Sequence, residues 1–233
     1  MSCIYLIRHG QASFGQHDYD CLSPLGEQQA ARLGEALAAR QPPFDHVIVG
    51  SMKRHRQTAS LCLTQSDQQL PEAQWQTDAN WNEYDHQNII AAFNPTFCDP
   101  VEMKAYLAAQ PDPKLTFATL FNKAMNRWLS GQHDGDYIES WEGYQQRIQQ
   151  ALAKTLEAAP EHKSIAVFTS GGPISLVAQR LLGIPEHHLM KLNWTLLNAG
   201  ITKLVHSPRQ TFLAALNDHG HFEGEFQSML TYK

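Results

Sequence analysis

Long apolar runs, paired cysteines and an excess of basic residues are all missing from this sequence of 233 residues. The four cysteines stand far apart and form no CxxC pair, which is typical of reduced thiols rather than of a disulfide framework. No apolar stretch approaches the ~18 residues of a membrane span, and the N-terminal residues lack the basic segment of a signal peptide. Lys and Arg number 18 against 23 Asp and Glu, a net charge of −5, so we expect no basic face to neutralise nucleic-acid phosphates. The sequence thus predicts a cytoplasmic protein that binds neither a membrane nor nucleic acid, and it carries no signal for an oligomeric state.

The residues that are present have the balance of a globular protein, with 42% hydrophobic and 18% charged side chains. Ser23 is a good N-cap and Pro24 suits the first helical position, so a helix is predicted from there to the prolines at 42 and 43. Short β-type apolar runs predict strands at residues 3–7, 46–49, 75–77, 164–168, 201–205 and 211–216. Apolar periodicity predicts further helices at residues 53–63, 140–158 and from about 173 to 182.

This alternation of strands and helices predicts an α/β fold, a three-layer α/β/α sandwich with a mostly parallel sheet. The last two strands are too close in sequence for a crossover helix, so one of them is expected to be antiparallel. We interpret residues 1–233 as a single domain with a helical insertion at about 87–135, which contains two helix-like stretches, residues 101–109 and 115–129. The aromatic residues Phe117, Phe121 and Trp128 recur there at near-helical spacing, which favours core packing over substrate contact.

Chemistry is concentrated where the first strand ends, at Arg8, His9 and Gly10. In an open parallel sheet, ligands bind beyond the carboxyl ends of the strands. A histidine at that edge, beside an arginine and a flexible glycine, fits a nucleophile with a neighbouring cation. His9 alone fits a hydrogen-bonded structural histidine equally well.

A resemblance decides between these interpretations. Residues 6–11 (LIRHGQ) resemble the RHG motif of the histidine phosphatase superfamily, the phosphoglycerate-mutase-like fold. Residues 22–30 (LSPLGEQQA) are similar to that family's L-(S/T)-x-x-G-x-x-Q-A helix start, and residues 53–59 (KRHRQTA) to its x-R-A-x-Q-T-A segment. Residues 82–85 (NEYD) stand where the family places its acid, and Glu139-Ser140 and residues 197–202 follow in the family's order.

The resemblance implies a role for each matching residue. His9 would be the nucleophile that carries a phosphohistidine, and Arg8 and Arg54 would bind the phosphoryl oxygens through their planar guanidinium groups. Glu83 would give the leaving alcohol its proton, although a surface ion pair is the alternative role for this carboxylate. Arg56 points to another helix face than Arg54 and is assigned to the surface.

The sequence departs from the pattern of this family at four places, one of which is Gly15, where the family often has an asparagine. Ser170 stands where the family usually has a second histidine that contacts the phosphoryl group, although Gly171 still allows close approach of the backbone. Gly50 aligns with a common serine, and Ala12 with a hydroxyl residue. We expect Gln11, Ser170 and Gly171 to bind the substrate. Losing a transition-state donor costs roughly 2.7–4 kcal/mol, so the efficiency of catalysis is in doubt.

Three functions therefore stay open. The first is a phosphomonoester hydrolase acting on a small phosphorylated substrate. The second is phosphoglycerate-mutase-type phosphoryl transfer. The residues after Gln11 argue against it, because they lack the tryptophan–asparagine continuation associated with sugar-acid mutases. The third, motivated by Ser170, is a weakly active or inactive phospho-ligand-binding protein. The presence of His9, the two arginines and Glu83 argues against a fully inactive site.

No metal or other cofactor is expected. The sequence offers no carboxylate cluster of the kind that magnesium prefers. The histidines at 187, 188, 219 and 221 have no cysteines or carboxylates at ligand spacing, and we interpret them as exposed turn residues.

Overall fold

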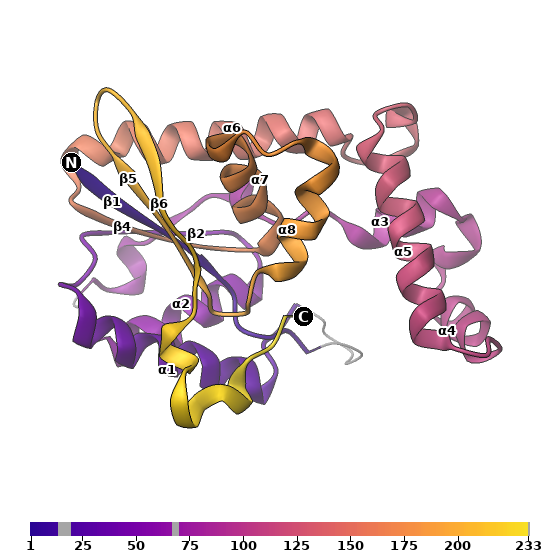
Figure 1. Ribbon diagram of the computed structural model, residues 1–233, viewed down its shortest axis with the longest axis horizontal. Coiled ribbons are helices and arrows are strands. Elements are labelled where there is room, and N and C mark those ends of the chain that lie inside the picture. The colour runs from indigo at the N-terminus through magenta and orange to yellow at the C-terminus, as the bar shows by residue number, and fades with distance from the viewer. Residues whose placement is uncertain (14–19, 67–69, 233) are drawn as a thin grey trace. The chain divides into compact units, whose positions relative to one another are not determined.

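The computed structural model describes residues 1–13, 20–66 and 70–232 (Figure 1). The chain divides into two compact units. The first is formed by Met1–Glu83 together with Ile148–Lys233, and the second by Tyr84–Arg147.

A six-stranded sheet with the order β3-β2-β4-β1-β5-β6 forms the centre of the first unit. β1 pairs in parallel with β4, β4 with β2, and β2 with β3, whereas β5 is antiparallel to both β1 and β6. The sheet is therefore mostly parallel with one reversed strand, as the short link before the last strand predicts. Its strands are β1 (Ser2–Arg8), β2 (His46–Val49), β3 (Gln76–Thr77), β4 (Ser164–Thr169), β5 (Ile201–His206) and β6 (Thr211–Asp218).

Helices cover both faces of this sheet, which confirms the α/β/α prediction (Figure 1). On one side lie α1 (Pro24–Arg40) and α2 (Lys53–Gln65), and on the other α7 (Gly171–Leu182) and the part of α6 (Trp141–Ala158) that belongs to this unit. α1 begins where the sequence predicts, because the Ser23 hydroxyl accepts a hydrogen bond of 3.0 Å from the Gly26 amide. The short helix α8 (Leu189–Thr195), which the sequence analysis did not predict, follows α7.

The central strands are apolar on both faces, as a covered parallel sheet requires. Tyr5 and Ile7 of β1 pack in one cluster with Leu33 of α1 and Cys62 of α2, while Ile4, on the alternate face, is also fully buried. Short 3-10 helices occupy several connections: Glu72–Gln74, Ala79–Trp81, Pro95–Cys98, Asp134–Asp136, Ala159–Glu161, Glu186–His188, Gly220–Phe222 and Gly224–Met229.

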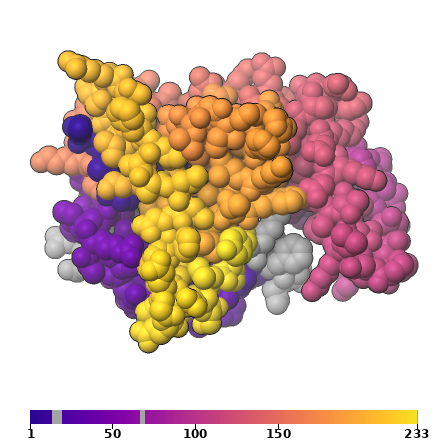
Figure 2. Space-filling view, viewed as in Figure 1, coloured from indigo at the N-terminus to yellow at the C-terminus, as the bar shows by residue number. Residues whose placement is uncertain are grey.

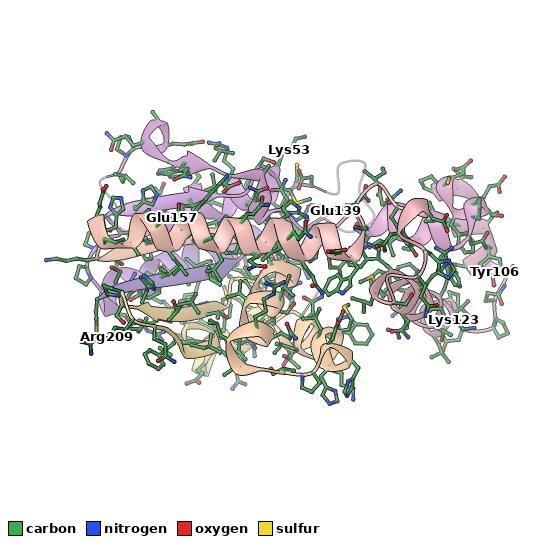
Figure 3. The ribbon with its side chains drawn as sticks, turned by 90° about the horizontal axis from the view of Figure 1, so that it is seen from above. Lys53, Tyr106, Lys123, Glu139, Glu157 and Arg209 are labelled. Atoms are coloured by element: carbon green, nitrogen blue, oxygen red, sulfur yellow. The ribbon has the colours of Figure 1, made fainter. Side chains whose placement is uncertain are left out.

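The second unit is helical and has its own aromatic core. Trp128 is buried there, with its ring centroid 5.4 Å from Tyr84 and 5.1 Å from Trp141. Phe121 is buried as well, in line with the core-packing interpretation. Figure 3 labels Tyr106 and Lys123, which lie on the outside of this unit. Its helices are α3 (His86–Phe93), which was not predicted, α4 (Pro100–Ala108), α5 (Pro113–Leu129) and the start of α6.

The C-terminal segment folds back onto α1. Figure 2 shows the yellow C-terminal residues against the purple residues of α1. The Arg32 side chain donates from Nε to the carbonyl of His221 at 3.1 Å, and its guanidinium stacks 3.9 Å from the Phe226 ring centroid. This packing buries His221 to 1% exposure, so the prediction of an exposed turn histidine is wrong at this position. Burial, with the nearby Arg40 guanidinium, lowers the pKa of His221 to about 4.

We predict that His221 makes the folded state sensitive to acid. The folded protein keeps this imidazole neutral down to about pH 4, whereas the unfolded chain takes up the proton below about 6.5. Stability from this group is therefore complete above 6.5 and is lost as the pH falls towards 4, by up to about 1.4 kcal/mol per pH unit. Urea unfolding at several pH values should give a shallower decline for His221→Gln than for the wild type. His187→Gln, at an exposed position, serves as the control. Equal slopes for all three proteins would contradict the prediction.

Candidate active site

Three parallel strands end side by side and bring the predicted site residues to one edge of the sheet. Arg8, the last residue of β1, pairs with Thr169, the last residue of β4. The His9 amide then donates to the Thr169 carbonyl at 2.9 Å, and the Gly50 amide, just after β2, donates to the Phe168 carbonyl at 3.0 Å. The carboxyl ends of parallel strands are where open α/β sheets bind ligands.

His9 is held as a neutral imidazole with one nitrogen suited to attack. Its Nδ1 lies 2.7 Å from the carbonyl of Gly10, an acceptor, so Nδ1 carries the proton. Its Nε2 accepts a hydrogen bond of 3.2 Å from Nε of Arg54 and therefore has a lone pair. Burial, reinforced by Arg54 and Arg8, holds the pKa of His9 well below its ordinary value. A neutral ring with an available Nε2 is what nucleophilic attack on phosphorus requires.

Two arginines stand next to this histidine. Arg54 lies in the first turn of α2, is 5% exposed, and forms an ion pair of 2.7 Å with Asp20. Arg8 donates from Nη1 to the backbone carbonyls of Leu196 and Tyr232, the latter at 2.9 Å. Guanidinium groups fixed in this way are suited to the non-bridging oxygens of a phosphoryl group.

The side chain of the predicted acid, Glu83, contacts the first turn of α7. The carboxylate of Glu83 accepts a hydrogen bond of 3.1 Å from the Gly172 amide, in the first turn of that helix. The chain just before it is fixed by the Thr169 hydroxyl, which donates to the Trp81 carbonyl at 2.5 Å. A half-buried carboxyl group therefore reaches the edge of the sheet at which His9 lies.

Gln11 and Gly171 occupy opposite sides of this edge. The Gln11 side-chain oxygen accepts from the Ser23 hydroxyl at 2.8 Å, and the backbone N–H of Gln11 donates to the side-chain oxygen of Gln29 at 2.8 Å. Gln11 is thus fixed against the start of α1. Gly171 opens α7, and a Cβ there would lie 2.6 Å from Oδ1 of Asn193 and 3.4 Å from Nε of Arg8, so a larger residue would displace the Asn193 side chain.

Ser170 has a partner that the sequence analysis missed. Its hydroxyl lies 2.6 Å from Nε2 of His55, and both side chains are fully buried. The one signal in the sequence is that His55 replaces the alanine of the x-R-A-x-Q-T-A segment. Arg56, by contrast, is exposed and pairs with Glu72 at 2.5 Å, as predicted.

A resident metal has no ready-made site in residues 1–13, 20–66 and 70–232, where no three or more His, Cys, Asp or Glu side chains gather to hold an ion. Within the same residues, no helix has the length and apolar character needed to cross a membrane.

The family model of the histidine phosphatase superfamily (branch 1) matches residues 4–90 and 112–219. The chain belongs to this superfamily and is an enzyme of that class. The matched residues include His9, Arg54 and Glu83.

Curated relatives match a shorter stretch. The chain is 38% identical over 72 residues to a broad-specificity phosphatase of Saccharomyces cerevisiae, which is 28% of this chain and 31% of that protein. It is 40% identical over 60 residues to the mitochondrial serine/threonine-protein phosphatase Pgam5 of Caenorhabditis elegans, 26% of this chain and 21% of that protein. The matched stretches span less than a third of these relatives.

Solved structures share the fold over nearly the whole chain. A phosphoglycerate mutase from Bacillus anthracis has a TM-score of 0.64 at 20% identity, covering 94% of both chains. A putative alpha-ribazole-5'-P phosphatase from Escherichia coli has a TM-score of 0.63 at 21% identity, covering 94% of this chain and 98% of that one. A phosphoserine phosphatase from Entamoeba histolytica, in complex with phosphoserine, has a TM-score of 0.62 at 19% identity, covering 95% and 99%.

Proposed function

We propose that this protein hydrolyses small phosphomonoesters through a phosphohistidine on Nε2 of His9. The observation that carries the proposal is the state of that imidazole. It is neutral, oriented by the Gly10 carbonyl and placed beside the guanidinium of Arg54. The curated relatives are described as phosphatases, which supports hydrolysis over transfer to a second substrate.

In the first step, the Nε2 lone pair of His9 attacks phosphorus, and the bond from phosphorus to the ester oxygen breaks. Arg8 and Arg54 neutralise the charge on the non-bridging oxygens, where it is spread in the transition state. The carboxyl group of Glu83 gives its proton to the leaving oxygen, and the alcohol departs.

In the second step, water attacks the phosphohistidine. Glu83, now a carboxylate, takes a proton from that water, and the bond between phosphorus and Nε2 breaks. Inorganic phosphate leaves and His9 is again neutral, so the cycle balances without a cofactor. We also propose the cytoplasmic location that the sequence predicts, since the four cysteines stand far apart in the sequence and form no CxxC pair.

We predict that His9 becomes covalently phosphorylated during turnover. Quenching the reaction with a labelled phosphomonoester should trap an adduct that is labile in acid and stable in base, and peptide mapping should place it on His9. His9→Ala should lose both the adduct and phosphate release, whereas His187→Ala, at an exposed residue, should keep both. A His9→Ala protein with wild-type turnover would rule out this nucleophile. Transfer of label to a phosphoglycerate instead of water would indicate a mutase.

We predict that Glu83 matters most for poor leaving groups. General acid catalysis is commonly worth about 10²–10⁴-fold. Glu83→Gln should therefore slow hydrolysis of an alkyl phosphate by that order, and of p-nitrophenyl phosphate by much less, because nitrophenolate leaves without a proton. Glu72→Gln removes a carboxylate paired with Arg56 and is the matched control. Equal losses on both substrates would assign Glu83 a binding or structural role.

We predict that turnover does not need a divalent metal. The two arginines and backbone N–H groups can meet the charge of the phosphoryl group. Exhaustive treatment with EDTA, followed by removal of the chelator, should leave kcat within about twofold of its starting value. An activity that EDTA abolishes and Mg²⁺ or Zn²⁺ restores would show that a metal takes part.

A further inference from the structure

An imidazole and a hydroxyl group from distant parts of the chain meet in the interior beside His9. His55 is the third residue of α2, and Ser170 lies between β4 and α7. Both are fully buried, with Nε2 of His55 2.6 Å from the Ser170 hydroxyl oxygen. The ring centroid of His55 is 5.7 Å from that of His9. The pair is therefore next to the proposed nucleophile without facing solvent.

The Ser170 hydroxyl is not used to begin a helix, although serine in that place usually is. A serine just before a helix normally accepts a hydrogen bond from an amide in the first turn. Ser170 makes no such bond to α7, and the Gly172 amide donates instead to the carboxylate of Glu83. The Ser170 hydroxyl forms its hydrogen bond with His55 instead.

Gly50 leaves the space in which the His55 ring lies. A Cβ at position 50 would be 2.1 Å from Nδ1 and 2.8 Å from Cε1 of this imidazole. Real Cβ atoms do not approach so closely, and Gly50 is fixed in place by its hydrogen bond to the Phe168 carbonyl at the end of β4. Glycine at 50 and histidine at 55 therefore depend on each other.

The hydrogen bonds of the pair allow two placements of its protons. Burial and the charge of Arg54 hold the pKa of His55 well below its ordinary value, so the ring is neutral with one N–H. Its Nδ1 has no hydrogen-bond partner in the described residues, whereas Nε2 faces the Ser170 hydroxyl, which can donate or accept. With the proton on Nδ1, that N–H has no acceptor; with the proton on Nε2, His55 donates to Ser170 and the hydroxyl proton of Ser170 has no acceptor among the described residues. A phosphoryl oxygen beside Ser170 would accept that hydroxyl proton, so a bound phosphate monoester would favour the proton on Nε2.

We propose that His55 is a positioning residue, which holds Ser170 so that its hydroxyl donates to an oxygen of the transferred phosphoryl group. The inference rests on the proposed function. Ser170 is near that group because the residue before it accepts a hydrogen bond from the His9 amide. The departures at positions 50, 55 and 170 from the family pattern are then one replacement, in which α2 supplies the imidazole and Ser170 makes the contact.

A double-mutant cycle tests this arrangement with p-nitrophenyl phosphate, with His9→Ala as the blank for enzymatic turnover. Ser170→Ala should lower kcat/KM at least about tenfold, and His55→Ala by a similar factor that appears mainly in kcat. Because His55 acts through Ser170, the double variant should be no worse than Ser170→Ala. Losses that multiply, or a His55→Ala enzyme with wild-type kcat, would overturn the proposal.

Two further variants separate positioning from a general loss of packing. Cys62→Ala truncates another fully buried residue of α2 and should lower the Tm with little change in kcat. Gly50→Ala should lower kcat about as much as His55→Ala in the wild type, and by a smaller factor once His55 is alanine, where the contact of 2.9 Å between a Cβ at position 50 and Oδ1 of Asn82 remains. A Gly50→Ala loss that is the same in both backgrounds would overturn the coupling. A wild-type protein without phosphatase activity would instead remove the proposed function, and this inference with it.

Discussion

The parallel register between β1 and β4 is the constraint on which the site depends. It pairs Arg8 with Thr169, and the residues that follow, His9 and Ser170, leave the sheet next to each other. The backbone of His9 is fixed from the other side as well, since its carbonyl accepts from the Ala199 amide and the Asn198 side chain, each at 3.2 Å. A slip of one residue would turn every side chain of β1 to the opposite face. Leu6 and Ile7, on opposite faces of the strand, are both fully buried, so that slip would break close packing on both sides of the sheet.

The protonation state of His9 follows from its burial and from the two arginines beside it. Burial of the His9 imidazole, reinforced by the two guanidinium groups next to it, lowers its pKa and keeps a lone pair available at neutral pH. In the proposed reaction, a phosphate monoester would bring the negative charge that these two cations neutralise. Arg54 meanwhile pairs with Asp20, and Arg8 binds backbone carbonyls, so both remain oriented in its absence.

Much of this arrangement could be predicted from sequence because it is local. The strand at residues 46–49 has its predicted bounds, and the helix begun by Ser23 and Pro24 begins there. The two helices that were missed, α3 and α8, have 8 and 7 residues, too short for a 3.6-residue period to be recognised. His221 was misjudged because its burial comes from α1, which is far away in the sequence.

The site shows the same division between local and distant information. His9 and Arg54 could be named from motifs, and they do make contact. His55 could not be predicted as a site residue, because its partner Ser170 is 115 residues away in the sequence. A histidine in place of the alanine of the motif does not indicate which residue its side chain contacts. Ser170 was recognised as a departure, but a departure in one motif does not reveal the compensating residue in another. Pairs of this kind become visible only when the strands that carry them are placed side by side.

The position of β1 in the sheet also has a consequence for biosynthesis. Of the six strands of this sheet, β1 is synthesised before the others although it lies at the centre, and both of its neighbours, β4 and β5, come much later in the chain. Until those segments are made, β1 has two unpaired edges and apolar side chains on both faces, the kind of segment that associates with other chains. Contacts so distant in sequence also slow folding, because a long loop must close before they form. α1 and α2, which pack against Tyr5 and Ile7, follow β1 closely in the chain, whereas α7, on the other face of the sheet, comes after β4, so one face of β1 stays uncovered for longer.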